Sequence, residues 1–295
     1  MKDAVRHLIT GEELDRQALS ELLERAVELK AGRADGEGGY SLENLSVALI
    51  FERPSTRTRV SFEVGISELG GTPIVLRGDE LQLSRGESVG DTARVLSRYV
   101  AAIGVRSGSH EVVGELAEAA EVPVINMLTP EHHPCQVLAD LLTLRERFGE
   151  IEGLTLAYVG DGNNLARSLA ILGRTAGVEV IVSSPEGYRL EEGLCELVDD
   201  PKAAVEGADA VYTDVWVSMG DEAEAESRRT TLAPYQLNED LLASASDRAI
   251  ALHCLPAHPG EEITEGVLYG ERSAVWDQAE NRLHAQKALL EFLLA

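Results

Sequence analysis

Apolar segments of strand length alternate with helical patterns along most of this chain of 295 residues. Helices are the usual connection between parallel strands, which cannot be joined by a tight turn. The alternation therefore predicts an α/β protein with parallel sheets. The strands that we expect lie at residues 45–51, 72–76, 101–106, 122–126, 154–159, 179–183, 210–213 and 249–252.

A long helical pattern that starts at Pro134 and ends in Phe148-Gly149-Glu150 divides the strands into two sets. We expect a domain boundary there, with a first domain over residues 1–148 and a second over 149–277. The last helical pattern, residues 278–295, carries apolar positions that could pack on either domain. The predicted fold is two doubly wound parallel-sheet domains followed by a C-terminal helix.

The charge of the chain limits its partners. Lysine and arginine number 26 against 51 aspartates and glutamates, a formal net charge of −25. Such a surface repels nucleic acid and anionic membranes, which bind basic proteins, and no apolar run approaches the roughly 18–20 residues of a membrane-spanning helix. We therefore expect no nucleic acid and no membrane as partner.

The same composition predicts a salty environment. At about 1 M salt the screening length falls to about 3 Å, so the self-repulsion of an acidic surface largely disappears. Only 4 of the 26 basic residues are lysines. Scarce lysine beside abundant glutamate favours a halophilic origin over a merely acidic mesophile.

The three cysteines, Cys135, Cys195 and Cys254, lie far apart without a C-x-x-C spacing, and the N-terminus has no apolar signal-peptide core. We expect reduced thiols and a cytoplasmic protein. His132-His133 is followed at once by a proline, and His253 stands beside a lone cysteine. Because neither arrangement has the paired spacing of metal ligands, no structural metal is expected.

The segment after the first predicted strand is built like an anion site. Residues 53–59 contain three arginines and three hydroxyl side chains, and they lead directly into a helical pattern. Backbone N–H groups at a helix N-terminus attract an oxyanion, to which Ser55, Thr56 and Thr58 add donors and Arg57 a bidentate fork. Phosphate fits best; a capped helix with solvated arginines is the alternative.

Polar side chains also follow two other strands of the first half. Arg106 ends the strand at 101–106, and His133 and Gln136 stand about one helical turn apart at the start of the next helix. They could hold one small ligand together. By itself, His133 could equally be a capping or surface histidine.

The passage Gly160-Asp161-Gly162 in the second half invites a dinucleotide interpretation, which fails in detail. Leu165 stands where the third glycine belongs, and no acidic residue closes the next strand at 180–184. The amides of Asn163 and Asn164 suit the carboxylate and amino group of an amino acid instead.

Two more segments follow strands of the second half. Asp214 could pair with a substrate ammonium or could simply cap a helix, and Cys254 could be a buried apolar residue. The dipeptide His253-Cys254 also suggests a cysteine hydrolase. Neighbours on a strand point to opposite faces, however, so the two are not automatically a dyad.

Together these motifs closely resemble those of the ornithine carbamoyltransferases, in the same order and over the whole chain. The motifs are Ser55-Thr56-Arg57-Thr58-Arg59, His133-Pro134-Cys135-Gln136, D-x-W-x-S-M-G from Asp214 and His253-Cys254-Leu255-Pro256, with residues 84–93 also in agreement. The resemblance implies that the C-terminal helix packs back on the first domain, that no cofactor is needed, and that the protein is a homotrimer or a multiple of trimers.

The resemblance also implies two sets of binding residues. Carbamoyl phosphate would contact Ser55, Thr56, Arg57, Thr58, Arg106, His133, Gln136, Cys254, Leu255 and Arg282, together with Gln82 from a neighbouring subunit. L-Ornithine would contact Asn164, Asp214, Ser218 and Met219. The catalytic residues would be Arg106, His133, Asp214 and Cys254.

These residue types suit a direct transfer. The neutral δ-amine of ornithine would attack the carbamoyl carbon, and Thr58, Arg106 and His133 would stabilise the charge that develops on the carbonyl oxygen. Asp214 and Cys254 would orient the amine and take its proton. The products would be L-citrulline and phosphate.

Other functions are less well supported. The aspartate carbamoyltransferases usually have His-Pro-Leu-Pro where this chain has His253-Cys254-Leu255-Pro256, and their dicarboxylate acceptor needs cationic partners. Putrescine or an acylated ornithine as acceptor, and a non-catalytic amino-acid-binding protein, stay open. Because the reaction is reversible, the site motifs do not decide between arginine synthesis and arginine degradation.

Overall fold

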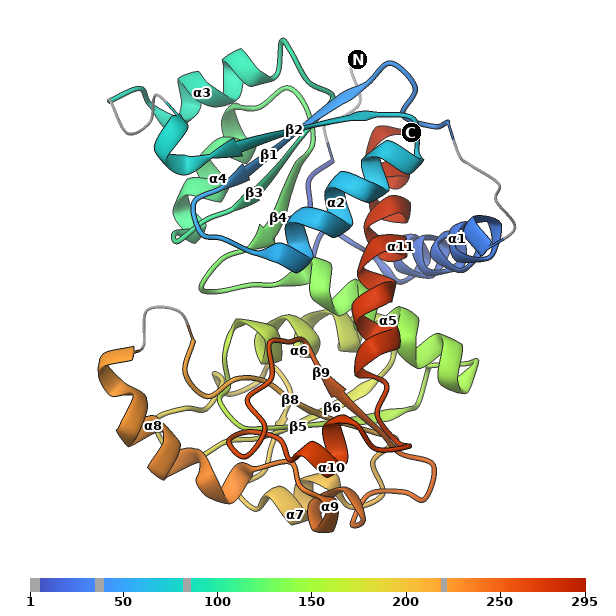
Figure 1. The fold of residues 1–295 in the computed structure, drawn as a ribbon, viewed down its shortest axis with the longest axis vertical. Helices are drawn as coiled ribbons and strands as arrows, with labels where there is room; N and C mark the ends of the chain where they lie inside the picture. Colours follow the sequence, from blue (N-terminus) through green and yellow to red (C-terminus); the bar gives the residue numbers. More distant parts are fainter. Residues whose placement is uncertain (1–5, 35–39, 82–85, 219–221) are drawn as a thin grey trace. The chain divides into compact units, whose positions relative to one another are not determined.

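The computed structural model describes residues 6–34, 40–81, 86–218 and 222–295 (Figure 1). The chain forms two compact units, the first made of Met1–Leu142 and Asn281–Ala295 and the second of Thr143–Glu280. Two helices, α5 (Pro134–Phe148) and α11 (Val275–Leu294), contribute residues to both units.

The first unit contains a four-stranded parallel sheet in the order β2-β1-β3-β4. Its strands are β1 (Ser46–Phe51), β2 (Thr72–Arg77), β3 (Ala102–Arg106) and β4 (Val124–Leu128). Its other elements are α1 (Arg16–Ala34), α2 (Thr56–Glu68), the 3-10 turn η1 (Gly78–Glu80), α3 (Val89–Leu96) and α4 (His110–Ala119). On one face, Ala48 and Ile50 of β1 pack with Val113 and Leu116 of α4, so this face of the sheet is buried.

The second unit contains a five-stranded parallel sheet in the order β7-β6-β5-β8-β9. Its strands are β5 (Thr155–Val159), β6 (Glu179–Ser183), β7 (Glu196–Leu197), β8 (Ala210–Thr213) and β9 (Ile250–His253). Its helices are α6 (Asn164–Ala176), α7 (Pro201–Val205), α8 (Ala225–Leu232), α9 (Glu239–Leu242) and α10 (Glu265–Leu268), with 3-10 turns η3 (Glu222–Glu224) and η4 (Ala233–Tyr235). Val159 and Val211 of the strands pack with Leu241 of α9 and Val267 of α10.

The predicted fold class is confirmed, because both sheets are parallel and helices supply most of the connections between their strands. All eight predicted strands are present, with ends that differ by at most two residues from the expected ones. The sequence missed β7, which has only two residues and one of them, Glu196, exposed. So short a strand produces no apolar run. Among the residues that the structure describes, no helix is both long and apolar enough to cross a membrane.

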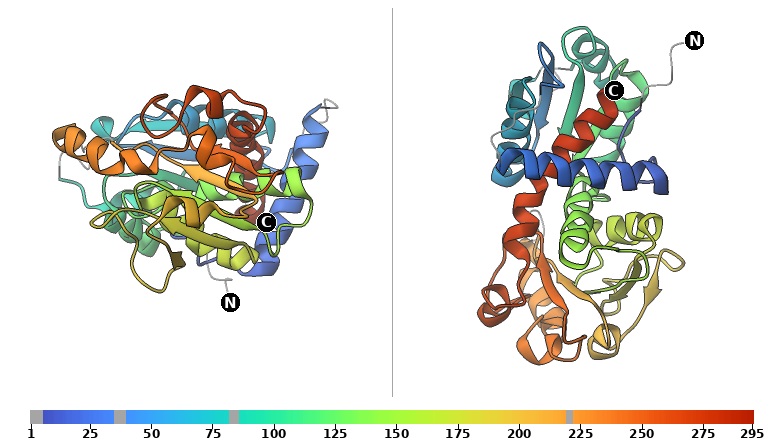
Figure 2. Two further views of the ribbon diagram at one scale, coloured as in Figure 1. Left: turned by 90° about the horizontal axis from the view of Figure 1, so that it is seen from below. Right: turned by 90° about the vertical axis from the view of Figure 1, so that its right-hand side faces the viewer.

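The C-terminal helix α11 starts three residues earlier than expected and joins the first unit from Asn281 onward. Lys30 Nζ of α1 donates to Asn281 Oδ1 over 2.7 Å, and Arg25 Nε donates to Glu291 Oε2 over 2.6 Å. Figure 2 shows α1 crossing α11. Lys287, almost fully buried, donates to Glu68 Oε2 of α2 over 2.9 Å. Charged contacts therefore anchor α11 to both α1 and α2.

His284 lies on α11 with its side chain fully buried near Lys30 and Lys287. Burial, and then these positive charges, lower its pKa from the ordinary 6.5 to about 4. Between these two values His284 binds more protons in the unfolded chain than in the folded one, so its contribution makes the free energy of unfolding fall as the pH is lowered from 6.5 to 4.

We expect the variant His284→Met to lose part of this pH dependence of the free energy of unfolding. Methionine fills a similar volume with an apolar side chain that does not titrate. The measurement is the urea midpoint of unfolding at pH 7 and at pH 5 for both proteins. An equal shift of the midpoint in the two proteins would show that His284 does not contribute to it.

Candidate active site

Each sheet has one point at which its strand order reverses. In the first unit this point lies between β1 and β3, and in the second between β5 and β8. Ligands of open parallel sheets bind outside the carboxyl ends of the strands at such a point, because the loops there leave to opposite sides. Apart from Arg282, which lies in α11, the predicted site residues end or follow these strands or their neighbours.

The anion site predicted after β1 begins helix α2. Ser55 is the N-cap residue, and its Oγ accepts a hydrogen bond from the backbone N–H of Thr58 over 3.3 Å. Thr58 is buried, Ser55 and Arg57 are half-buried, and Thr56 is exposed. The positive end of a 13-residue helix thus lies among hydroxyl groups.

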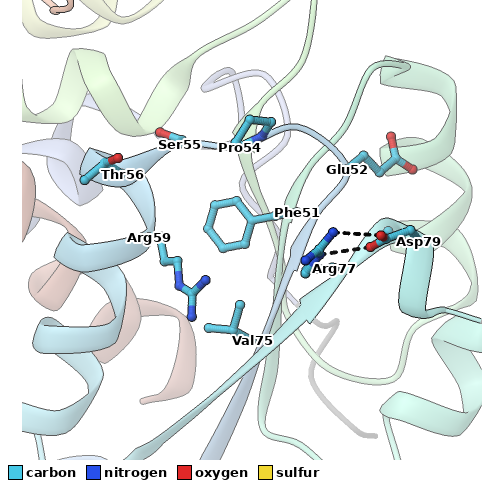
Figure 3. Close-up of a pocket in the computed structure, with 10 residues that line it drawn as sticks. Phe51, Glu52, Pro54, Ser55, Thr56, Arg59, Val75, Arg77 and Asp79 are labelled. Atoms are coloured by element: carbon cyan, nitrogen blue, oxygen red, sulfur yellow. Dashed lines mark hydrogen bonds and ion pairs between the residues drawn. The ribbon is translucent and has the colours of Figure 1, made fainter.

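A cavity of about 580 Å³ opens beside this helix start. Figure 3 shows Ser55 and Thr56 on one side of it and Arg77, paired with Asp79, on the other. Glu52 and Arg59 also line the cavity. Two of the predicted anion-site residues, Ser55 and Thr56, thus line a cavity with the volume of a small-molecule pocket.

A chain of buried hydrogen bonds connects α2, α5 and α11 behind the anion site. Arg282 donates from Nη2 to Thr58 Oγ1 over 2.9 Å and from Nη1 to Gln136 Oε1 over 2.7 Å. Gln136 Nε2 in turn donates to Asp140 Oδ1 over 2.8 Å. Because Asp140 accepts and Arg282 donates, the amide of Gln136 has one possible orientation.

His133 lies in the same region with only 6% of its surface exposed. Burial lowers its pKa well below 6.5, and the charges of Arg282, Arg106 and Arg57 lower it further. His133 is therefore a neutral imidazole near pH 7. Its remaining N–H group can donate a hydrogen bond. The effect of all three arginines on one ring places four predicted site residues together.

Glu52, which sequence reasoning did not single out, connects the loops after β1 and β3. Its Oε2 accepts hydrogen bonds from Ser107 Oγ over 2.6 Å and from the N–H of Gly108 over 2.9 Å. Its own N–H donates to the carbonyl of Arg106 over 3.0 Å. Glu52 thereby holds the segment that follows Arg106 next to the anion site.

The second site centres on Asp214, a carboxylate only 6% exposed at the end of β8. Its Oδ1 accepts from the thiol of Cys254 over 2.8 Å, and its Oδ2 accepts from Asn163 Nδ2 over 2.8 Å. The Oδ1 of Asn163 also caps α6 by accepting from the backbone N–H groups of Leu165 and Ala166. Asn163 therefore ties Asp214 rigidly to a helix N-terminus.

His253 ends β9 and Cys254 begins the turn that follows. The fully buried His253 accepts a hydrogen bond from the N–H of Leu255 at Nδ1 over 2.8 Å, so its proton is on Nε2, 3.0 Å from Glu262 Oε1. Leu255 has a φ of +58°, which side chains other than glycine rarely adopt. Cys254 bonds to Asp214 and His253 to Glu262, but a ring nitrogen of His253 also lies within 4.8 Å of the Cys254 sulfur, so the two side chains do not point away from each other.

The glycine-rich loop after β5 has a packing explanation. A Cβ atom on Gly162 would lie 2.5 Å from the carbonyl oxygen of Tyr188, to which the N–H of Gly162 donates over 2.8 Å. Glycine is required at this position by the close approach of two backbone segments. Backbone packing therefore explains the second glycine of this loop, and a bound dinucleotide is not needed to explain it.

Two groups of three side chains among the described residues are spaced so that they could hold a metal ion: Asp214, His253 and Cys254, and His258, Glu261 and Glu262. In the first group each member already has a hydrogen-bond partner in the protein. Neither group has the paired spacing of a structural zinc site.

The structure brings the predicted residues together in two clusters, one in each unit. The first contains Ser55, Thr58, Arg57, Arg106, His133, Gln136 and Arg282, and the second contains Asp214 and Cys254. Asn164 is half-buried and follows Asn163, which bonds to Asp214. Ser218 is half-buried four residues after Asp214. Gln82 and Met219 fall outside the residues that the structure describes.

Two family models match this chain and together span almost all of it. Residues 6–146 match the carbamoyl-P binding domain of the aspartate/ornithine carbamoyltransferases, and residues 152–293 match their Asp/Orn binding domain. The chain belongs to the aspartate/ornithine carbamoyltransferase family.

Individual members of the family are similar over their full length. An ornithine carbamoyltransferase of Acidothermus cellulolyticus is 53% identical, covering 98% of this chain and 97% of the relative. The solved structure of an ornithine carbamoyltransferase from Pyrococcus furiosus has a TM-score of 0.94 at 48% identity, covering 97% of this chain and 96% of that one. One from Thermus thermophilus has a TM-score of 0.92 at 42% identity, covering 98% and 99%.

The position of Arg282 in this family member leads to a binding prediction. We expect Arg282→Gln to weaken the binding of inorganic phosphate about tenfold or more, because it removes a cation and leaves Thr58 without its donor. Isothermal titration calorimetry with inorganic phosphate measures the effect. Lys287→Gln is the matched control, since it removes a buried cation of the same helix that bonds to Glu68 instead. Equal phosphate affinities in the two variants would contradict a role of Arg282 in anion binding.

Proposed function

We propose that this chain is an ornithine carbamoyltransferase, which transfers the carbamoyl group of carbamoyl phosphate to the δ-amine of L-ornithine. The observation that carries the proposal is the buried carboxylate of Asp214, held by Cys254 and Asn163. A carboxylate suits an acceptor that arrives as an ammonium and does not suit the dicarboxylate aspartate. The full-length relatives named ornithine carbamoyltransferase support the same acceptor.

The first cluster supplies the charge that carbamoyl phosphate needs. The phosphate is bound by Ser55, Thr56, Arg57, Thr58 and Arg282 at the start of α2, and Gln136 contacts the carbamoyl group. Arg106 and the neutral His133 donate to the carbonyl oxygen, on which negative charge develops during attack. Because His133 is already neutral, it stabilises this charge as a hydrogen-bond donor.

The second cluster prepares the nucleophile. An alkyl ammonium has a pKa near about 10, so it must lose a proton before its nitrogen lone pair can form the new C–N bond. Asp214 accepts this proton or passes it on, and Cys254 orients the carboxylate and lies with Leu255 at the reacting end. The C–O bond to phosphate then breaks, and phosphate leaves with the bonding electrons.

Asn164, Ser218 and Met219 hold the α-amino and α-carboxylate groups of ornithine. No cofactor takes part in this scheme, because orientation and preorganised charge are sufficient for direct transfer. The substrate partners are thus carbamoyl phosphate and L-ornithine.

We further propose a homotrimer, or a multiple of trimers, in which Gln82 of one subunit completes the carbamoyl phosphate site of the next. The molar mass of the protein by light scattering tests the assembly, and mixing inactive Gln82 and Arg57 variants tests the sharing. Restored activity in mixed trimers supports a shared site, and none would contradict it.

The decisive experiment is a citrulline assay from carbamoyl phosphate with ornithine, aspartate and putrescine as parallel acceptors. Turnover selective for ornithine is expected. Turnover with putrescine instead would indicate a different amine acceptor. A folded protein without turnover, at low and at multimolar KCl, would indicate an amino-acid-binding protein.

Two substitutions should show which residues bind which of the two substrates. Arg57→Ala should raise the KM for carbamoyl phosphate about tenfold or more and lower kcat, because a guanidinium is lost from the anion site. Asp214→Asn keeps the side-chain volume but removes the charge, so it should raise the KM for ornithine and leave phosphate binding unchanged. Steady-state kinetics with each substrate varied in turn measure both effects, and wild-type kinetics in both variants would overturn the site assignment.

We also propose that the protein works in a cytoplasm of high salt, because its formal net charge is −25. Screening at about 1 M salt removes most of the repulsion within such a surface. Activity, melting temperature and the stability of the trimer should therefore all increase between about 0.1 M and 2 M KCl. The same activity and melting temperature at both concentrations would argue for an acidic protein of an ordinary cytoplasm.

A further inference from the structure

Helix α8 of the second unit carries an ion pair to which none of the motifs assigns a role. Arg228 Nη1 lies 2.7 Å from Asp161 Oδ2, and only 14% and 13% of the two side chains are exposed. Most exposed ion pairs contribute little to stability, but a pair as sheltered as this one is screened much less by solvent. The partners of Arg228 show which segments this ion pair connects.

The guanidinium of Arg228 contacts three segments outside its own helix, and its Nε also lies 3.7 Å from Glu224 Oε2, one turn earlier in the chain. Besides Asp161, in the loop after β5, it donates from Nη1 to the carbonyl of Trp216 over 3.2 Å, in the segment after β8. Its plane also lies over the ring of Tyr188, with 5.2 Å between Cζ and the ring centroid. A planar guanidinium holds a carboxylate, a carbonyl and a ring face in one fixed geometry, whereas an ammonium is a compact point charge on a flexible stem.

Both hydrogen-bonded segments lead directly to the amino-acid site. Trp216 is buried and stands two residues from Asp214 on one side and two from Ser218 on the other. Asp161 stands two residues before Asn163, whose amide donates to Asp214. Arg228 therefore connects, outside the site, the two segments that meet at the Asp214 carboxylate inside it.

We propose that Arg228 is a positioning residue for the amino-acid acceptor. Its bonds to Asp161 and Trp216 keep the segments after β5 and β8 at the separation that lets Asn163 hold Asp214 and that keeps Ser218 beside it. Arg228 itself does not touch ornithine. The inference rests on the proposed function, because it assumes that these segments bind ornithine.

The test compares Arg228→Gln, Arg228→Lys and Asp161→Asn with wild type. Arg228→Gln should raise the KM for ornithine about tenfold or more, while the KM for carbamoyl phosphate stays within about twofold, since the anion site lies in the other unit. Arg228→Lys should recover part of the loss, because a lysine keeps the charge but not the fork. Asp161→Asn should act like Arg228→Gln, and the double variant should be little worse than either single one.

Arg229→Gln is the matched control. Arg229 is the next residue of α8, with half of its side chain exposed, and it pairs with Glu261 over 3.0 Å instead of Asp161. Its removal changes the charge of the same helix by the same amount. The KM for ornithine should stay at the wild-type value.

The outcomes separate this inference from the proposed function. If wild type makes no citrulline, the proposed function fails. If wild type is active but Arg228→Gln and Asp161→Asn keep its KM for ornithine, the positioning role is wrong. Equal rises in the KM values for both substrates, or an equal rise for ornithine in Arg229→Gln, would also overturn it, because a general loss of structure or charge would then explain the change. If Arg228→Gln does not fold, Arg228→Lys and Asp161→Asn decide by the same criteria.

Discussion

Parallel pairing of the strands is the constraint on which the rest of this structure depends. Parallel strands need long connections, and here helices supply most of them. All strands of a sheet then end at the same edge, where helices begin. At the reversal points between β1 and β3 and between β5 and β8, loops leave to opposite sides. Residues distant in sequence meet there, and each unit has its binding cluster at this edge.

The two clusters have opposite charge, and this difference gives them different ligands. In a chain with a formal net charge of −25, Arg57, Arg106 and Arg282 all act on the ring of His133. The second cluster instead presents the buried carboxylate of Asp214. One cluster therefore favours a phosphate and the other an ammonium, as the two substrates of the proposed transfer require.

The strands and the short motifs within both clusters could be predicted, because they depend on residues that are neighbours in sequence. Apolar runs indicated eight of the nine strands found in the described part of the chain, and the two-residue β7 was too short to be recognised. Hydroxyl and arginine side chains at the start of α2 indicated an anion site for the same reason. The contacts that hold each site in place were not predicted, and Asn163, expected to face an amino-acid ligand, instead bonds to Asp214 and caps α6. Glu52, Asn163 and Arg228 act through partners that lie 55, 51 and 67 residues away.

By itself, the sequence determined the α/β class, the order of the strands along the chain, the two kinds of ligand chemistry and the resemblance to one enzyme family. These depend on hydrophobic period, local capping and short motifs, which act over a few residues. Only the tertiary structure decided that His253 bonds to Glu262 while Cys254 bonds to Asp214. It also decided that Arg282 bonds to Thr58 across 224 residues. Such contacts form only when packed sheets and helices bring distant side chains within about 3 Å, a distance that no local pattern specifies.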